Sequence, residues 1–339
     1  RFYATINREP VDRLCTWLGI HDGAAHRKLF AYFEVGSLYE LIEKLDDDMV
    51  PIEMPYDSPT SDAIYAAFDF AKRGCVPREH RTLNSPGFFE DIDDPARVDE
   101  FDWPDPENHI DPDACRAVAE GAPRDRAVLA VIWSAHFQDA CAAFGMENAF
   151  IKMVEQPEMV HAVTERIVEF YLKANEIFFE ATKGKIDAVL IGNDFGAQKG
   201  LLLSPDMIRA FALPGTRRII EQAKSYGIKV IHHSCGSIRP IIPDLIEAGA
   251  DAIHPVQALA KDMEPSDLHS EFGDRVSFCG GVDAQYLMVR GTPDGVKAKV
   301  HELKSIFSTG LIVSPSHEAI LPDTHPANIL AMFEAVRED

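Results

Sequence analysis

Short runs of apolar residues alternate with longer amphipathic stretches along most of the chain. Several of the short runs are continuously apolar, which is typical of strands that are covered on both faces. In the longer stretches apolar residues recur three and four positions apart, which predicts helices, the longest over residues 157–183. Strands are expected at 14–18, 49–53, 128–133, 188–191, 228–232, 252–253, 276–279 and 311–313.

Eight alternations of strand and helix predict an α/β fold, a parallel (β/α)8 barrel of the TIM type. An open, doubly wound sheet is the alternative. The first expected strand lacks the Gly-x-Gly-x-x-Gly turn that would favour that alternative. The 339 residues are ordinary for one barrel with insertions, so we interpret 1–339 as a single domain.

Residues 55–123 depart from this alternation, because they are rich in Asp and Pro, as at 91–95 and 103–106. We interpret them as an insertion after the second strand, partly helical and folded over the barrel mouth. A solvated connector between the second and third strands is an equally good interpretation.

The formal net charge of −22 restricts the kinds of partner that the protein can bind. Such a surface repels phosphate backbones and anionic lipid, so a small ligand or a basic partner fits better than nucleic acid or a membrane. No apolar run approaches the ~20 residues of a spanning helix, and the first residues do not resemble a secretory signal. Six scattered cysteines without a Cys-x-x-Cys pair indicate reduced thiols and a cytoplasmic setting.

Residues able to bind metals, protons or polar ligands follow every expected strand. In a barrel the catalytic residues lie at the carboxyl ends of the strands, and in this sequence fewer such polar residues lie at the amino ends. The sequence therefore predicts an active site at the carboxyl ends. The candidate substrate-binding residues at these ends are His21, Asn193, His254, Gln257 and Asp283.

His233 and Cys235 are the strongest candidate pair of metal ligands. Side chains two positions apart on an extended chain point the same way, so the imidazole and the thiol can share one ion. A His and Cys set suits Zn²⁺, and an open position would make it catalytic. A hydrogen-bonded histidine beside a buried cysteine is the competing interpretation.

The expected third metal ligand is His317, because the eighth strand closes beside the first and its end faces the same mouth. Glu318 is a possible substitute, and His317 could instead donate a proton without a metal.

Asp194, His317 and Glu53 are the candidate catalytic residues. Asp194 could bind a substrate cation, orient a histidine or act as a base, or it could merely form a turn or helix cap. Glu53 is a metal ligand, an acid or an exposed loop residue.

The chain resembles the uroporphyrinogen decarboxylase superfamily at these positions. The resemblance covers most of the chain and is strongest over 193–328, where the sequence reads Asn-Asp-Phe-Gly at 193–196, His-Ser-Cys-Gly-Ser at 233–237, His-Pro-Val-Gln at 254–257 and Cys-Gly-Gly-Val-Asp at 279–283. It implies a barrel enzyme.

Two branches of the superfamily differ in their motifs. The decarboxylases have an arginine-rich opening, whereas the corresponding residues 17–23 contain no arginine. A substrate with eight carboxylates needs cationic partners. Zinc-dependent methyltransferases that act with corrinoid proteins have His-x-Cys-Gly after the fifth strand and a later cysteine. Residues 233–236 match the first motif, and residues 314–318 read Ser-Pro-Ser-His-Glu where the later cysteine is expected.

The resemblance therefore favours the methyltransferase branch. The hypothesis is methyl transfer between a small substrate, such as a methyl ether, methylamine or thiol, and a corrinoid carried by a partner protein, with zinc as Lewis acid. The alternative is a metal-free decarboxylase or lyase acting on a small carboxylic acid or a tetrapyrrole, with Asp194 and His317 handling protons. A third hypothesis is a non-enzymatic carrier of a corrinoid or tetrapyrrole.

Overall fold

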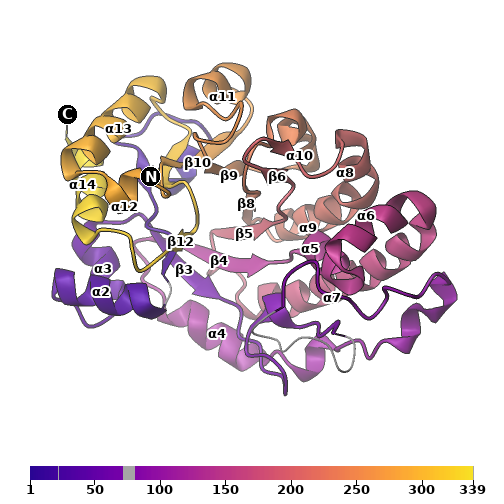
Figure 1. Cartoon of the computed structure of the whole chain (residues 1–339). Coiled ribbons are helices and arrows are strands. Elements are labelled where there is room, and N and C mark those ends of the chain that lie inside the picture. Colours follow the sequence, from indigo (N-terminus) through magenta and orange to yellow (C-terminus); the bar gives the residue numbers. More distant parts are fainter. Residues whose placement is uncertain (22, 72–80, 339) are drawn as a thin grey trace.

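A computed structural model of the chain describes residues 1–21, 23–71 and 81–338. Eight parallel strands form a nearly closed barrel surrounded by helices (Figure 1), in the order β1-β11-β10-β9-β8-β5-β4-β3. This confirms the predicted fold, and each expected strand overlaps an observed one. The strands are β1 (Cys15–Thr16), β3 (Met49–Glu53), β4 (Ala127–Trp133), β5 (Ala188–Gly192), β8 (Lys229–His233), β9 (Ala252–Val256), β10 (Ser277–Val282) and β11 (Leu311–Pro315).

The outer layer consists of helices that bury one apolar face against the strands. The expected helix over 157–183 is α7, which starts with a proline at its first position and covers Pro157–Ala181. The other helices are α2 (Gly23–Phe33), α3 (Leu38–Leu45), α4 (Pro112–Gly121), α5 (His136–Phe144), α6 (Met146–Glu155), α8 (Pro205–Phe211), α9 (Leu213–Ser225), α10 (Ile242–Ala248), α11 (Pro265–Phe272), α12 (Leu287–Arg290), α13 (Pro293–Ile306) and α14 (Pro326–Arg337).

A second, smaller core fills the inside of the barrel. It contains Trp17, Leu129, Leu190 and Cys279 together with Phe2 from the first helix, α1 (Phe2–Ile6). The start of β10 is tied to this helix, because the Ser277 hydroxyl lies 3.0 Å from the carbonyl oxygens of Thr5 and Ile6. Apolar packing thus occupies the amino ends of the strands, and the polar residues are left at the carboxyl ends.

Side-chain carboxylates join the first and second strands of the barrel. Asp48 accepts the Thr16 N–H at 2.9 Å, and Asp47 accepts the Leu18 N–H at 2.7 Å. Arg13 holds the Asp48 carboxylate at 2.8 Å. Two acidic side chains therefore bind β1 where, among the described residues, this strand has no backbone pairing with β3.

Aromatic side chains anchor the segment between β3 and α4. Phe68 packs on Phe170 of α7 with ring centroids 4.7 Å apart, and Phe89 packs on Phe144 of α5 at 5.9 Å. Phe70, Phe101 and Trp103 join these rings. The segment contains the 3-10 helices η1 (Ile64–Ala66), η3 (Pro95–Glu100) and η4 (Pro106–Asn108). Its placement over the barrel mouth stays a prediction.

Two short pairings bring loops together around the carboxyl ends. β2 (Ile20–His21) pairs with β12 (Ala319–Ile320), and β6 (Gly196–Ala197) pairs with β7 (Gly200–Leu201). The first of these pairings places the loop that follows β11 beside the loop that follows β1. Among the described residues, no helix has both the length and the apolar character that crossing a bilayer requires.

Candidate active site

The end of β8 brings an imidazole and a thiol into contact. His233 Nε2 lies 3.4 Å from Cys235 Sγ, which confirms that the two side chains converge. His232 points to the other face and stacks on Phe195 with ring centroids 6.0 Å apart. Glycine at position 192 makes room, because a Cβ there would lie 2.3 Å from the His233 carbonyl oxygen. The alternation of strand side chains thus sets the geometry of the pair.

Asp194 completes the pair from the end of β5. Its Oδ1 lies 3.2 Å from His233 Nε2 and accepts the Cys235 N–H at 3.0 Å. Burial opposes ionisation of Asp194, but the contacts with His233 and Cys235 outweigh it and lower its pKa to about 2. Burial likewise opposes charge on His233, and Asp194, Cys235 and Glu318 together raise its pKa to about 10.

The second nitrogen of His233 meets another histidine. His233 Nδ1 lies 2.8 Å from His254 Nδ1, and 3.5 Å from Glu318 Oε2. Burial, and then the charge of His233, lower the pKa of His254, so this ring is neutral. His254 Nδ1 therefore accepts the His233 Nδ1–H, and its own proton is on Nε2. The His254 ring packs against Trp17 with ring centroids 5.3 Å apart.

The loop after β11 supplies His317 and Glu318. His317 Nδ1 accepts the Ala319 N–H at 3.0 Å, so the proton of the neutral ring is on Nε2. One ligand atom each of Cys235, His317 and Glu318 lies within 4.8 Å of the others. Burial raises the pKa of the Cys235 thiol, but hydrogen bonds with His233 and His317 outweigh it and lower that pKa.

The donor set fits a zinc ion. Bonds of about 2.0–2.3 Å in a tetrahedron place ligand atoms roughly 3.3–3.6 Å apart. The contacts of His233 Nε2 with Cys235 Sγ and Asp194 Oδ1, at 3.4 and 3.2 Å, match this spacing. Asp194 is thus a candidate third ligand beside the predicted His317, because each belongs to a cluster that includes Cys235.

Two further predicted residues have buried side chains that bond to the backbone. The side-chain oxygen of Asn193, Oδ1, accepts the Phe137 N–H at 2.8 Å at the start of α5. Gln257 Oε1 accepts the Gly236 N–H at 2.7 Å and so supports the turn after Cys235. Gln257 also lines a cavity of about 320 Å³ beside His317, whose wall includes Ser316, Leu321 and Thr324.

Of the remaining predicted residues, Glu53 and Asp283 do not belong to the cluster. Glu53 lies at the end of β3 with part of its side chain exposed, and the desolvation of its carboxylate together with the charge of Asp62 raises its pKa. The Asp283 carboxylate accepts backbone N–H groups at 285–287, before and at the start of α12. His21 lies in β2, and its side chain is outside the described residues.

Trp133 is a site residue that the sequence analysis missed. Its ring is nearly perpendicular to that of His233, with ring centroids 5.4 Å apart. Trp133 and Ser134 both have a φ of 51°, a backbone conformation uncommon for residues other than glycine. The sequence does contain a signal for Trp133. The residue lies at the end of a continuously apolar strand, on the face that points into the barrel.

Comparisons with known proteins agree with this architecture. The family described as uroporphyrinogen decarboxylase (URO-D) matches residues 69–339. The uroporphyrinogen decarboxylase of Chlorobium limicola is 29% identical over 213 residues, which is 60% of this chain and 56% of that protein. That of Gloeobacter violaceus is 27% identical over 210 residues, 58% and 55% of the two chains. The chain thus matches little more than half the length of these curated relatives.

A solved structure, a methyltransferase from Methanosarcina mazei, has the same fold. It is 18% identical, the match covers 99% of this chain and 97% of that one, and the TM-score is 0.70. With the URO-D match over most of the sequence, the resemblance predicted from the motifs at 193–196, 233–237 and 279–283 is confirmed. This chain belongs to the uroporphyrinogen decarboxylase family.

Proposed function

We propose that the protein is a zinc-dependent methyltransferase that moves a methyl group between a small substrate and a corrinoid carried by a partner protein. The observation that carries this proposal is the contact of an imidazole nitrogen with a thiol and a carboxylate, at 3.4 and 3.2 Å, at the end of β8. The substrate class is a methyl ether, a methylamine or a thiol. The likeness of the fold to a methyltransferase is compatible with it.

His233, Cys235 and Asp194 would hold the metal. Bound zinc would act as a Lewis acid that keeps a thiol deprotonated or stabilises the charge on a leaving atom. His233 donates from Nδ1 to His254, which fixes the direction of Nε2. The lowered pKa of Cys235 keeps this side chain ready to ligate as a thiolate. The Nε2–H of His317 can give a proton at the half-exposed edge of the site.

The rim of the barrel mouth offers a surface for a partner protein. Four large apolar side chains in loops after strands are 36–57% exposed, and we propose that a partner protein covers them. They are Leu202, Leu259, Tyr286 and Leu321. The described cysteines are free thiols, which fits the reducing cytoplasm that we propose as the setting.

Metal analysis combined with a transfer assay tests the proposal. The purified protein should contain about one zinc per chain, and both His233→Ala and Cys235→Ala should lose the metal and the transfer of methyl groups to free cobalamin. His301→Ala is the matched control, because His301 is a half-exposed histidine that pairs with Glu338. An enzyme that transfers methyl groups at full rate without metal would refute the zinc-dependent scheme.

Decarboxylation of a small carboxylic acid is the second candidate. It is favoured by the names of the curated relatives, which are decarboxylases. Among the ion pairs of the described residues, however, Asp194 and Glu318 face histidines and no Lys or Arg. Release of carbon dioxide from candidate acids, unaffected by chelators, would favour this candidate over methyl transfer.

A further inference from the structure

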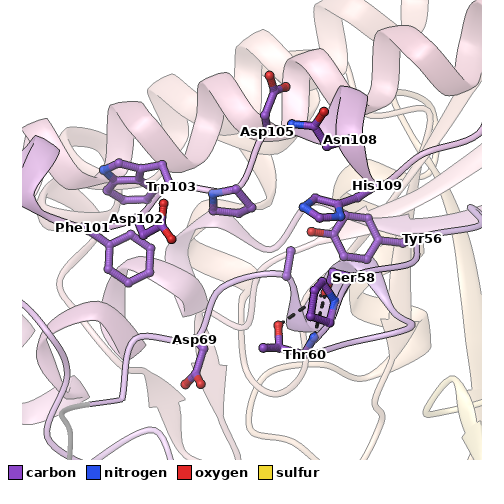
Figure 2. A pocket seen from close by; sticks show the side chains of 13 residues that line it. Tyr56, Ser58, Thr60, Asp69, Phe101, Asp102, Trp103, Asp105, Asn108 and His109 are labelled. Atoms are coloured by element: carbon purple, nitrogen blue, oxygen red, sulfur yellow. Dashed lines mark hydrogen bonds between the residues drawn. The ribbon is translucent and has the colours of Figure 1, made fainter.

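A second cavity, of about 570 Å³, lies in the segment between β3 and α4, apart from the His233 cluster. Figure 2 shows its lining side chains, which include Tyr56, Phe101, Asp102, Trp103 and His109. No Lys or Arg is among the described residues that line it. Aromatic rings and carboxylates therefore form the wall of this cavity.

Hydrogen-bond acceptors are among the polar groups of the residues that line this cavity. The His109 Nδ1–H donates to the Asp57 carbonyl oxygen at 2.9 Å, which leaves the lone pair of Nε2 free in the neutral ring. The indole N–H of Trp103 is already bonded to the Val98 carbonyl oxygen at 2.9 Å. A ligand that fits these groups must bring donors of its own.

One charged group in the cavity lacks a partner. Among the described residues, the carboxylate of Asp102 forms neither a hydrogen bond nor an ion pair, whereas Asp69 and Asp105 are neutralised by Arg81 and Lys173. Tyr56 is 4% exposed, and burial raises its pKa against a hydrogen bond with Ser58. Figure 2 shows the Asp102 carboxylate beside the rings of Phe101 and Trp103.

The aromatic walls are held rigidly. Phe101 and Trp103 contact each other at 4.8 Å and belong to the aromatic cluster that packs on α5 and α7. Tyr56 packs against His109 at 5.4 Å and against Phe170 at 6.4 Å. A cation over such rings is attracted by their negative faces, and an adjacent carboxylate strengthens the attraction.

We propose that this cavity binds an organic ammonium ion, with the charged nitrogen near Asp102 and the apolar body against Phe101 and Trp103. One uncompensated carboxylate matches one positive charge. The acceptors select a nitrogen that carries N–H groups, and the rings select an apolar body. The inference does not depend on the proposed methyl transfer, because it uses none of the residues around His233.

Calorimetric titration of the whole chain with benzylammonium and with benzyl alcohol tests the charge requirement, because the two probes have nearly the same shape. We expect saturable binding of one benzylammonium, with a dissociation constant on the order of 1 mM, and at least about tenfold weaker binding of the alcohol. Equal affinities, or no binding of benzylammonium, would overturn the proposal.

Two variants locate the binding. Asp102→Asn should weaken benzylammonium binding by roughly tenfold. Asp274→Asn, which changes an exposed carboxylate between α11 and β10, is the matched control and should leave the affinity unchanged. Asp102 is exposed and unpaired, so its replacement should not disturb folding. Unchanged affinity in Asp102→Asn would refute this site.

Two further titrations complete the test. Cys235→Ala should bind benzylammonium as the unaltered chain does, and loss of binding in that variant would place the cation at the His233 cluster and so refute the proposal. Nα-acetyl-lysine methylamide should bind with the same dependence on Asp102. If it binds more tightly than benzylammonium, the cation comes from the lysine of a partner protein, and otherwise it comes from a free amine.

Discussion

The two nitrogens of His233 organise the candidate site. Nε2 faces Cys235 and Asp194, while Nδ1 faces His254 and Glu318. A ring whose second nitrogen donates to a neutral partner presents the first nitrogen in a fixed direction, as metal-ligating histidines generally do. A single strand residue thus connects the metal donors to the groups that orient them.

The thiol of Cys235 should be the most reactive of the described cysteines in metal-free protein. Cys235 is partly exposed, whereas Cys15, Cys115, Cys141 and Cys279 are buried. Thiolates are the nucleophiles, and His233 and His317 favour the thiolate of Cys235. Iodoacetamide at neutral pH should therefore label Cys235 first among these five, and His233→Ala should slow the labelling several-fold. Peptide mass spectrometry over time measures both, with His301→Ala as the control.

Labelling of a buried cysteine such as Cys141 before Cys235, or an unchanged rate in His233→Ala, would contradict this account. The comparison is made within one molecule, so differences in protein concentration or reagent do not affect it.

The sequence predicted this pair because alternation along a strand is a local rule. Residues 233 and 235 share a face provided that the chain stays extended just past the end of β8 at His233. The sequence did not predict that Asn193 and Asp283 use their side chains to bind backbone N–H groups, because that depends on loop conformation. Trp133 was not predicted as a site residue, because no turn residue such as glycine indicates its φ of 51° at the strand end.

At the scale of elements, a repeated aspartate ties neighbouring strands together at their amino ends. The residue just before β3, β5 or β9 accepts a backbone N–H from the neighbouring strand: Asp48 from Thr16, Asp187 from Val128 and Asp251 from Val230. The three distances are 2.8–2.9 Å. These carboxylates satisfy donors that would otherwise be lost where the ladders begin.

Replacing Asp187 tests this arrangement. Asp187→Ala removes the acceptor of the Val128 N–H and of the Tyr3 hydroxyl, both at 2.8 Å. We expect the free energy of unfolding to fall by about 2 kcal/mol, because a partly buried donor loses its partner. Urea unfolding measures the change, and Asp274→Ala, at an exposed position, should change it by less than about 0.5 kcal/mol. Equal losses in the two variants would argue against a structural role for these aspartates.

Asp47 should make the stability of the barrel depend on pH. Its side chain is buried, and burial raises its pKa from 3.8 to about 7 although the Leu18 N–H bonds to it. The folded chain therefore holds a proton that the unfolded chain releases. The stabilisation from this proton is complete below the unfolded pKa and is lost as pH rises to about 7.

Asp47→Asn should abolish this dependence, because an amide keeps an acceptor for the Leu18 N–H and carries no charge. Between pH 5 and pH 8 the unaltered chain should lose roughly 2–4 kcal/mol of unfolding free energy relative to Asp47→Asn. Urea unfolding at the two pH values gives the difference, in which other titrating groups cancel. Parallel pH profiles would show that Asp47 is ionised in the folded chain.

The strands and helices could be predicted because burial on both faces leaves a strong pattern, as in the continuous apolar run of β4 (Ala127–Trp133). The junction of β1 and β3 could not be predicted. There the contacts come from Asp47 and Asp48, which look like surface acids in the sequence but are buried. The aromatic cluster in the segment after β3 was not predicted either. Phe68, Phe89 and Phe101 lie among Asp and Pro residues that obscure any helical or strand spacing.

At the scale of the whole molecule, apolar packing at one end of the barrel and polar groups at the other separate stability from chemistry. Phe2 and Ile6 of α1 fill the inner core with Leu129 and Cys279, while His233 and its neighbours lie at the ends where the strands stop. Changes at the mouth should therefore alter activity with little effect on folding, and this makes the mouth suitable for testing partner binding.

The exposed apolar rim provides that test. If a corrinoid protein docks on the mouth, Leu259→Ser and Tyr286→Ser should reduce methyl transfer to the protein-bound corrinoid by roughly tenfold, because each removes apolar area from the interface. Transfer to free cobalamin should stay unchanged, since neither residue belongs to the His233 cluster. Val154→Ser, at a 73% exposed apolar position on α6, is the control. Equal losses with free and protein-bound corrinoid would mean that the rim acts on the chemistry itself, and no loss with either would remove the mouth as the docking surface.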